Sequence, residues 1–166
     1  MPKQEELLTK ILREDHEPKN RSFALYLLAY LESGPKVMEH VNYGLLDPAD
    51  EVRDAGMDIL TDIAIFQKDI ALPIELVIKM LDFPSPNDRS RALSLMLTLA
   101  SRKDYRDHLL FQASDQFLKL LRSKHPTNHE MAHIVLRLLA GEDFPERDYN
   151  AWDQWVWKAR RKNISE

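Results

Sequence analysis

The stretch Asp47-Pro-Ala-Asp-Glu-Val-Arg-Asp-Ala55 joins an Asp-Pro turn to the start of an amphipathic helix. Proline suits this position because it has no amide hydrogen to donate and its φ angle fits the first turn of a helix. Arg53 is followed by Gly56, Leu60 and Ile63, at spacings of three, four and three residues. Residues with this spacing lie on one face of a helix, so the stretch predicts a turn followed by a helix with one apolar face.

An internal repeat becomes visible when this helix is compared with the rest of the chain. The same spacing occurs four times, and the copies begin 32, 36 and 40 residues apart. Each copy begins with arginine or histidine, continues with a small residue and ends with two large apolar residues. The copies are Arg21, Ala24, Leu28 and Leu31; Arg53, Gly56, Leu60 and Ile63; Arg89, Ala92, Met96 and Leu99; and His129, Ala132, Leu136 and Leu139.

A second apolar segment precedes each copy, and a turn containing proline separates the two. These segments are Leu7–Arg13, Val37–Leu46, Ile74–Leu81 and Leu109–Leu121. Each repeat is therefore expected to be a helix, a tight turn and a second helix. Because one such unit cannot bury its apolar face alone, the repeats are expected to stack on one another.

The repeats predict an all-α fold, a right-handed α-solenoid of about four helix pairs. We expect a single domain over residues 1–166, with repeats at 4–33, 34–70, 71–103 and 104–141 and a short capping helix within 142–162. Asp104 is expected to begin the first helix of the fourth repeat. Gly141 is expected to end its second helix, because glycine readily adopts the left-handed conformation found there.

The composition excludes several classes of protein and of functional site. A chain of 166 residues with 44% hydrophobic and 30% charged residues is too charged for a membrane protein and too apolar for a disordered one. The net charge of −4 gives no general affinity for nucleic-acid phosphates, and the absence of cysteine excludes disulfides and thiolate metal ligands. The longest apolar run, Ala24–Leu31, is far shorter than the roughly 20 residues of a membrane span, and residues 1–15 contain no apolar core of a secretory signal. We therefore expect a cytoplasmic protein.

The pattern resembles HEAT repeats, and Asp47–Ala55 carries the resemblance best. The tail resembles a cap found in bacterial HEAT-repeat proteins: Leu136–Gly141 matches Leu-x-x-Leu-x-Gly, Asp143 and Phe144 follow, and Trp152 and Trp155 match Trp-x-x-Trp. The resemblance covers nearly the whole chain. It implies an α-solenoid, but solenoids have many functions, so it does not by itself identify one.

The motif His129-Glu-Met-Ala-His133 matches H-E-x-x-H, the signature of zinc peptidases. Histidines four residues apart on a helix can hold one zinc ion, and the glutamate can act as general base. In the repeat register, however, His129 occupies the place of the arginines and His133 occupies a core position. No third ligand follows at the usual spacing. We therefore interpret both histidines as structural and expect no metal and no cofactor.

The arginines of the repeat, Arg21, Arg53 and Arg89, are expected to have a structural role. The resemblance implies that each pairs with acidic residues near the turn of its own or a neighbouring repeat. An acidic ligand is the alternative partner for these arginines. The candidate acidic residues are Asp47, Asp50, Asp82 and Asp88.

An acidic stripe distinguishes the second repeat. Residues 47–69 contain seven Asp or Glu and two Lys or Arg, and Asp54, Asp58 and Asp62 lie four residues apart on one helix face. Tyr26 and Tyr30 occupy equivalent positions to Asp58 and Asp62 in the first repeat, and tyrosine is common at contact surfaces. These five residues form our candidate binding surface. The alternatives are a solvated acidic face and tyrosines that simply pack under the first helix.

The C-terminal segment contains three tryptophans. Trp152 and Trp155 lie on one helix face and are expected to cover the end of the stack. Trp157 is expected to be exposed, next to Lys158, Arg160, Arg161 and Lys162. Cations near a helix C-terminus favour the helix dipole, which is our interpretation. Contact with nucleic acid or a membrane surface is the alternative.

The function that follows is a non-catalytic protein-interaction module. It would present a curved helical surface to a protein or peptide partner, with a basic partner favoured by the acidic stripe. Contact with membranes or nucleic acid is not expected, and self-association is a further option. The alternatives are a zinc-dependent hydrolase through the motif at 129–133 and a HEAT-like DNA-binding protein of the glycosylase type.

Overall fold

The computed structural model describes residues 2–31 and 34–164, and these contain ten α-helices and no strand. The predicted all-α fold is therefore confirmed. Contacts between residues divide the chain into two compact units, Met1–Leu76 and Val77–Glu166. Helix α5 (Ile74–Met80) spans this division. The single domain over residues 1–166 stays a prediction.

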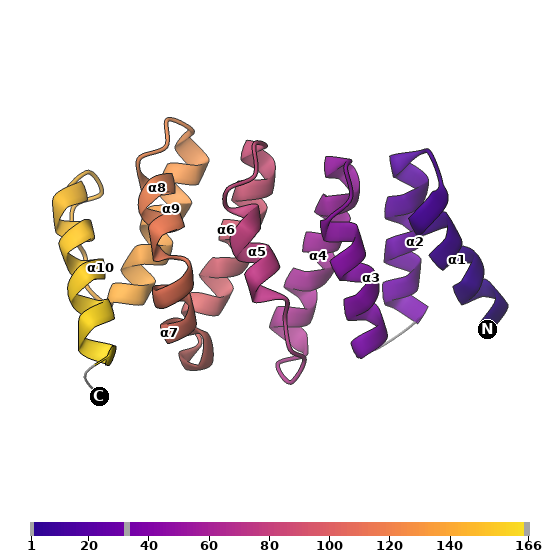
Figure 1. Cartoon of the computed structure of the whole chain (residues 1–166), viewed down its shortest axis with the longest axis horizontal. Helices are drawn as coiled ribbons and strands as arrows, with labels where there is room; N and C mark the ends of the chain where they lie inside the picture. The colour runs from indigo at the N-terminus through magenta and orange to yellow at the C-terminus, as the bar shows by residue number, and fades with distance from the viewer. Residues whose placement is uncertain (1, 32–33, 165–166) are drawn as a thin grey trace. The chain divides into compact units, whose positions relative to one another are not determined.

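The first unit contains four helices: α1 (Pro2–Glu14), α2 (Pro18–Leu31), α3 (Pro35–Leu45) and α4 (Asp50–Phe66). Helices α2 and α4 pack against each other, while α1 packs on α2 and α3 packs on α4 (Figure 1). The small and large apolar residues of the predicted repeats form this core, because Ala24, Leu28, Leu60 and Ile63 are all buried. Leu31 is the exception, since it lies partly exposed at the end of α2.

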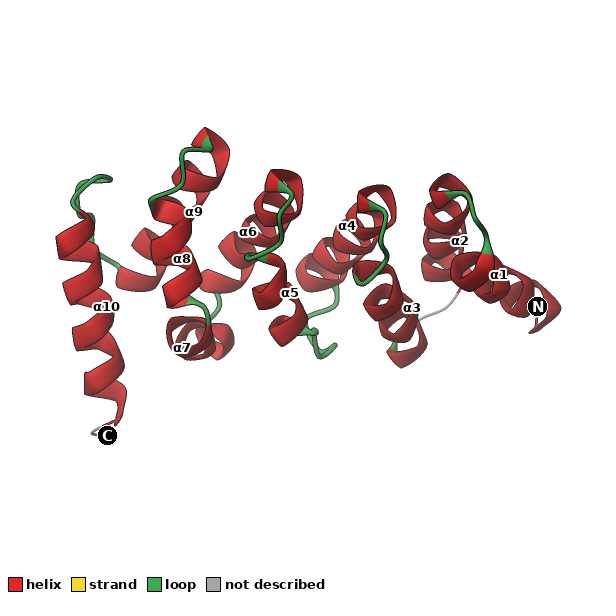
Figure 2. Ribbon diagram, turned by 45° about the horizontal axis from the view of Figure 1, so that its top comes forward, coloured by secondary structure: helices red, strands yellow, loops and turns green. Residues whose placement is uncertain are grey.

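The second unit contains α6 (Pro86–Ala100), α7 (Lys103–Gln112), α8 (Ser114–Leu121), α9 (Pro126–Ala140) and α10 (Tyr149–Ile164). Helix α9 packs between α6 and α8, and α10 contacts α7 and α8 (Figure 2). Proline opens α6 and α9 and accounts for both starts, as the repeat pattern predicts. Gly141 ends α9 in the left-handed conformation with φ 67°, which confirms its predicted role.

The predicted apolar segment Leu109–Leu121 is not one helix, because the chain breaks at Ala113 between α7 and α8. The buried Ser114 hydroxyl donates to the Leu110 carbonyl at 2.6 Å, a local bond that competes with regular helix geometry. Arg160 of α10 donates to the Leu110 carbonyl at 3.2 Å and the Phe111 carbonyl at 3.4 Å. The break therefore supplies acceptors that help to hold α10 in place.

The repeat arginines share one hydrogen-bond pattern. In each, Nη1 donates to the carbonyls six and five residues earlier, which lie in the turn before the helix, so each arginine fastens its own turn. The acceptors and distances are Asp15 (2.8 Å) and His16 (3.2 Å) for Arg21, Asp47 (2.8 Å) and Pro48 (2.9 Å) for Arg53, and Phe83 (2.6 Å) and Pro84 (2.8 Å) for Arg89.

In Arg21 and Arg89, the other nitrogens of the guanidinium join neighbouring helix pairs. Arg21 donates from Nε and Nη2 to both oxygens of Asp47, at 2.8 and 2.7 Å, and this hydrogen bonding raises the pKa of Arg21 above its ordinary value. The predicted pairing is thus confirmed for Arg21. It is wrong for Arg89, whose Nε donates to the amide oxygen of Asn128 at 3.0 Å. Asp82, one of the acids predicted for this role, pairs with Lys119 instead.

Candidate functional site

The five candidate surface residues come from the two packed helices α2 and α4. Tyr26 and Tyr30 lie on α2, and the three aspartates lie on α4. The Tyr26 hydroxyl donates to the Asp58 carboxylate at 2.9 Å, so the two helices are bridged at the middle of the candidate surface. This bond holds the Tyr26 ring beside α4 instead of letting it turn freely into solvent.

A hollow of about 280 Å³ opens next to this bridge. Val37, Ile59 and Ile63 line it and are buried, whereas the rings of Tyr30 and Phe66 stand 86% and 78% exposed. We call this feature the aromatic–acidic hollow, since Asp62 is the one charged side chain among the described residues that line it. The complete lining is Tyr26, Ala29, Tyr30, Gly34, Val37, Ile59, Asp62, Ile63, Phe66, Gln67 and Ile70.

The structure therefore brings together only part of the predicted set. Tyr26, Tyr30 and Asp62 line the hollow, and Asp58 positions Tyr26 from its edge. Asp54 is half-buried one helical turn before Asp58 and does not line the hollow. The Asp54 side chain lies on the same face of α4 as Asp58, but outside the hollow.

Sequence reasoning missed Phe66, which supplies one wall. A signal for it exists, because Phe66 continues the four-residue spacing of Asp54, Asp58 and Asp62 by one further step. The stripe on α4 thus ends in an exposed aromatic ring instead of another carboxylate. Ile70 lies beyond the end of α4, and only the path of the loop brings it to the hollow.

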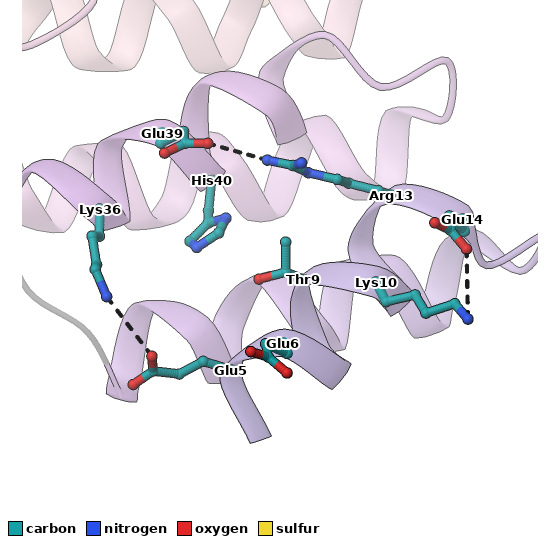
Figure 3. A pocket seen from close by; sticks show the side chains of 9 residues that line it. All are labelled: Glu5, Glu6, Thr9, Lys10, Arg13, Glu14, Lys36, Glu39 and His40. Atoms are coloured by element: carbon teal, nitrogen blue, oxygen red, sulfur yellow. Dashed lines mark hydrogen bonds and ion pairs between the residues drawn. The ribbon is translucent and has the colours of Figure 1, made fainter. Parts of the chain in front are cut away.

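A second hollow of about 530 Å³ lies between α1 and α3 and is lined mainly by charged side chains (Figure 3). Lys36 lies 3.8 Å from Glu5, and Arg13 lies 3.1 Å from Glu39, so ion pairs link the two helices across it. His40 points between these pairs from α3 (Figure 3). Because these opposite charges pair with one another, this hollow selects for the charge of a ligand less clearly than the aromatic–acidic hollow does.

A third hollow, of about 400 Å³, lies between α1 and α2. Its lining consists of Gln4, Leu7, Leu8, Leu27, Tyr30 and Leu31, and all of these except the half-buried Leu8 are exposed. No charged side chain is among the described residues that line it. Tyr30, which is 86% exposed, thus contributes to two hollows.

The histidines of the H-E-x-x-H match hold the segment that follows α9. His129 contacts the Leu121 carbonyl through Nδ1, and its Nε2 lies 2.6 Å from Glu146 Oε1. His133 Nε2 lies 3.3 Å from the Phe144 carbonyl. Within residues 2–31 and 34–164, no group of three or more His, Asp or Glu is arranged to hold a metal ion.

The C-terminal tryptophans take the predicted positions within the second unit. Trp152 is fully buried, and its ring meets those of His133, Phe144 and Trp155 edge to face. Trp157 is 57% exposed, and the Arg161 guanidinium lies 4.5 Å from its ring centroid. The basic side chain thus covers the exposed ring locally.

Comparison with known proteins is informative for the fold alone. No protein-family model matches the chain, and no curated protein matches it significantly. The crystal structure of an engineered protein is similar over 96% of this chain and 68% of its own, with a TM-score of 0.64 and 18% sequence identity. In the described part of the chain, no helix combines the length and apolar character needed to cross a membrane.

Proposed function

We propose that the protein is a non-catalytic interaction module of the HEAT-repeat type, whose α2–α4 surface binds a protein or peptide partner. The observation that carries this proposal is the exposure of Tyr30, Phe66 and Tyr26, at 86%, 78% and 42%, around one hollow. Water-exposed aromatic rings gathered at one place are costly to leave uncovered and are typical of contact surfaces. Covering them with a partner removes that cost.

The position of the rings on packed helices supports the same proposal. Helices α2 and α4 are held together by a buried core and by the bond between Tyr26 and Asp58. A surface built on such elements is already formed before a partner arrives, so little ordering entropy is lost on binding. The carboxylates beside the rings disfavour nucleic-acid phosphates, which argues for a polypeptide partner.

Site-specific photo-crosslinking tests this function. A photoreactive phenylalanine analogue replaces Tyr30 in one variant and Trp157, another exposed aromatic residue on α10, in a control variant. In a lysate of the source cells, we expect one discrete protein adduct from the Tyr30 position and none of the same mass from the Trp157 position. An adduct with a second copy of the chain would identify self-association.

Competition makes the test specific to the surface. Excess wild-type chain should abolish the adduct, whereas a chain with both Tyr30→Ala and Phe66→Ala should not. These side chains are largely exposed, so their removal should leave the helicity unchanged. Equal adducts from both crosslinker positions, or none from Tyr30, would contradict the proposal. The cytoplasmic location is part of the same proposal, and cell fractionation tests it.

A further inference from the structure

The aromatic–acidic hollow combines three chemical features in a small space: an apolar base, exposed aromatic rings and a carboxylate. Val37, Ile59 and Ile63 form a buried apolar base, and the exposed rings of Tyr30 and Phe66 line the hollow beside it. Its volume of about 280 Å³ is below the range of roughly 300–1,000 Å³ that is typical of sites for drug-sized ligands. The hollow is therefore suited to a single side chain of a partner.

The charge at the hollow is negative and uncompensated. Asp62 is exposed and lines the hollow, and within the described residues it has no hydrogen-bond or ion-pair partner. The surrounding residues 47–69 carry seven acidic and two basic side chains, a formal charge of −5. No lysine or arginine is among the described residues that line the hollow. An anionic occupant would be repelled, and a cation would be attracted.

A long basic side chain matches all three features at once. Lysine and arginine carry an apolar stem that can cover Ile59 and Ile63 while the charged end stays near water. The charged end is attracted both by the faces of aromatic rings and by a carboxylate. A purely apolar side chain would use the base and the rings but would leave Asp62 without a partner.

We propose that the aromatic–acidic hollow binds an arginine or lysine side chain of a basic segment in the partner polypeptide. Asp62 then contacts the cation directly, Tyr30 and Phe66 flank it, and Asp58 acts as a positioning residue through its bond to Tyr26. This inference rests on the proposed function and adds the chemical class of the bound segment.

The probe is a random peptide library displayed on phage and selected on the immobilised full chain. A second selection uses the Tyr30→Ala, Phe66→Ala chain, and only peptides specific to the wild type are taken further. We expect these peptides to share an Arg or Lys at one position. Replacing that Arg by citrulline, or that Lys by norleucine, should weaken binding at least ~10-fold, since cation–π and carboxylate contacts are lost together.

A matched pair of variants locates the charge effect. Asp62→Asn removes the carboxylate at the hollow and should weaken binding of the selected peptides about 3- to 10-fold, the range expected for losing a charge-assisted bond in partial solvent. Glu51→Gln makes the same change in net charge on the same helix, about 16 Å away along its axis. We expect Glu51→Gln to change the affinity less than 2-fold at moderate salt.

The outcomes separate the two proposals. Selected peptides that depend on the rings but lack a basic residue, or that ignore Asp62→Asn, would overturn the cation inference and leave the interaction module standing. If no peptide distinguishes the wild type from the Tyr30→Ala, Phe66→Ala chain, both proposals fail. Basic peptides weakened equally by Asp62→Asn and Glu51→Gln would show general charge attraction, and this also overturns the specific site.

Discussion

Removing the Asp47 carboxylate should weaken the connection between the first two helix pairs. Asp47 accepts two hydrogen bonds from Arg21 and a third from the Ala49 amide at 2.9 Å. The Arg21 and Asp47 side chains are only 11% and 3% exposed. In Asp47→Ala, the guanidinium keeps its two backbone carbonyls but loses the charge that compensates it.

The expected loss in the free energy of unfolding follows from the burial of this ion pair. Breaking one side of a buried ion pair costs about 3–5 kcal/mol, and we expect about 3 kcal/mol because Arg21 keeps some contact with water and its carbonyl partners. Asp47→Asn should cost less, about 1–2 kcal/mol, because an amide oxygen still accepts one hydrogen bond. The protein itself supplies the precedent, since Asn128 accepts from Arg89 in the second unit.

The assay is urea denaturation followed by far-UV circular dichroism, which yields the free energy of unfolding of each variant. Asp153→Ala is the control, because Asp153 lies 2.7 Å from Arg122 but both side chains are well exposed. It should cost less than about 1 kcal/mol. A similarly small loss in Asp47→Ala, or equal losses in the Asn and Ala variants, would show that the buried charge pair does not stabilise this connection.

Three further predictions concern other parts of the chain. Gly44→Ala should destabilise the protein by about 1–3 kcal/mol in urea melts, because its new methyl group would overlap the buried Leu25 side chain. Trp152→Ala should cost about 3–5 kcal/mol, whereas Trp157→Ala should stay within about 0.5 kcal/mol, since only the former ring is buried. After dialysis against a chelator, thermal unfolding should be unchanged and no stoichiometric zinc should remain by elemental analysis, because the ring nitrogens of His129 and His133 contact backbone and carboxylate oxygens. A zinc-dependent rise in melting temperature that disappears in His133→Ala would contradict the last prediction.

Local residue patterns specify the helices and the faces that they bury. The 3-4-3 spacing identified the four helices α2, α4, α6 and α9, since helical periodicity is a local property that any helix must obey. Proline and Gly141 likewise marked where helices begin and end, because the backbone conformation of each residue is a local property. The buried Trp152 and exposed Trp157 were likewise predictable from their positions on one helix.

Which side chains contact one another depends on how the helices pack in three dimensions. Tyr26 and Asp58, which form a hydrogen bond, are 32 residues apart in the sequence. Arg21 donates to Asp47 and Arg89 donates to the amide of Asn128, although all three arginines occupy the same position in the repeat. The break at Ala113 and the wall supplied by Phe66 depend on neighbouring helices and on a loop path that periodicity does not describe. A repeat pattern specifies the face that each helix buries, but hollows and cross-helix bonds arise from the distances and angles at which different helices pack.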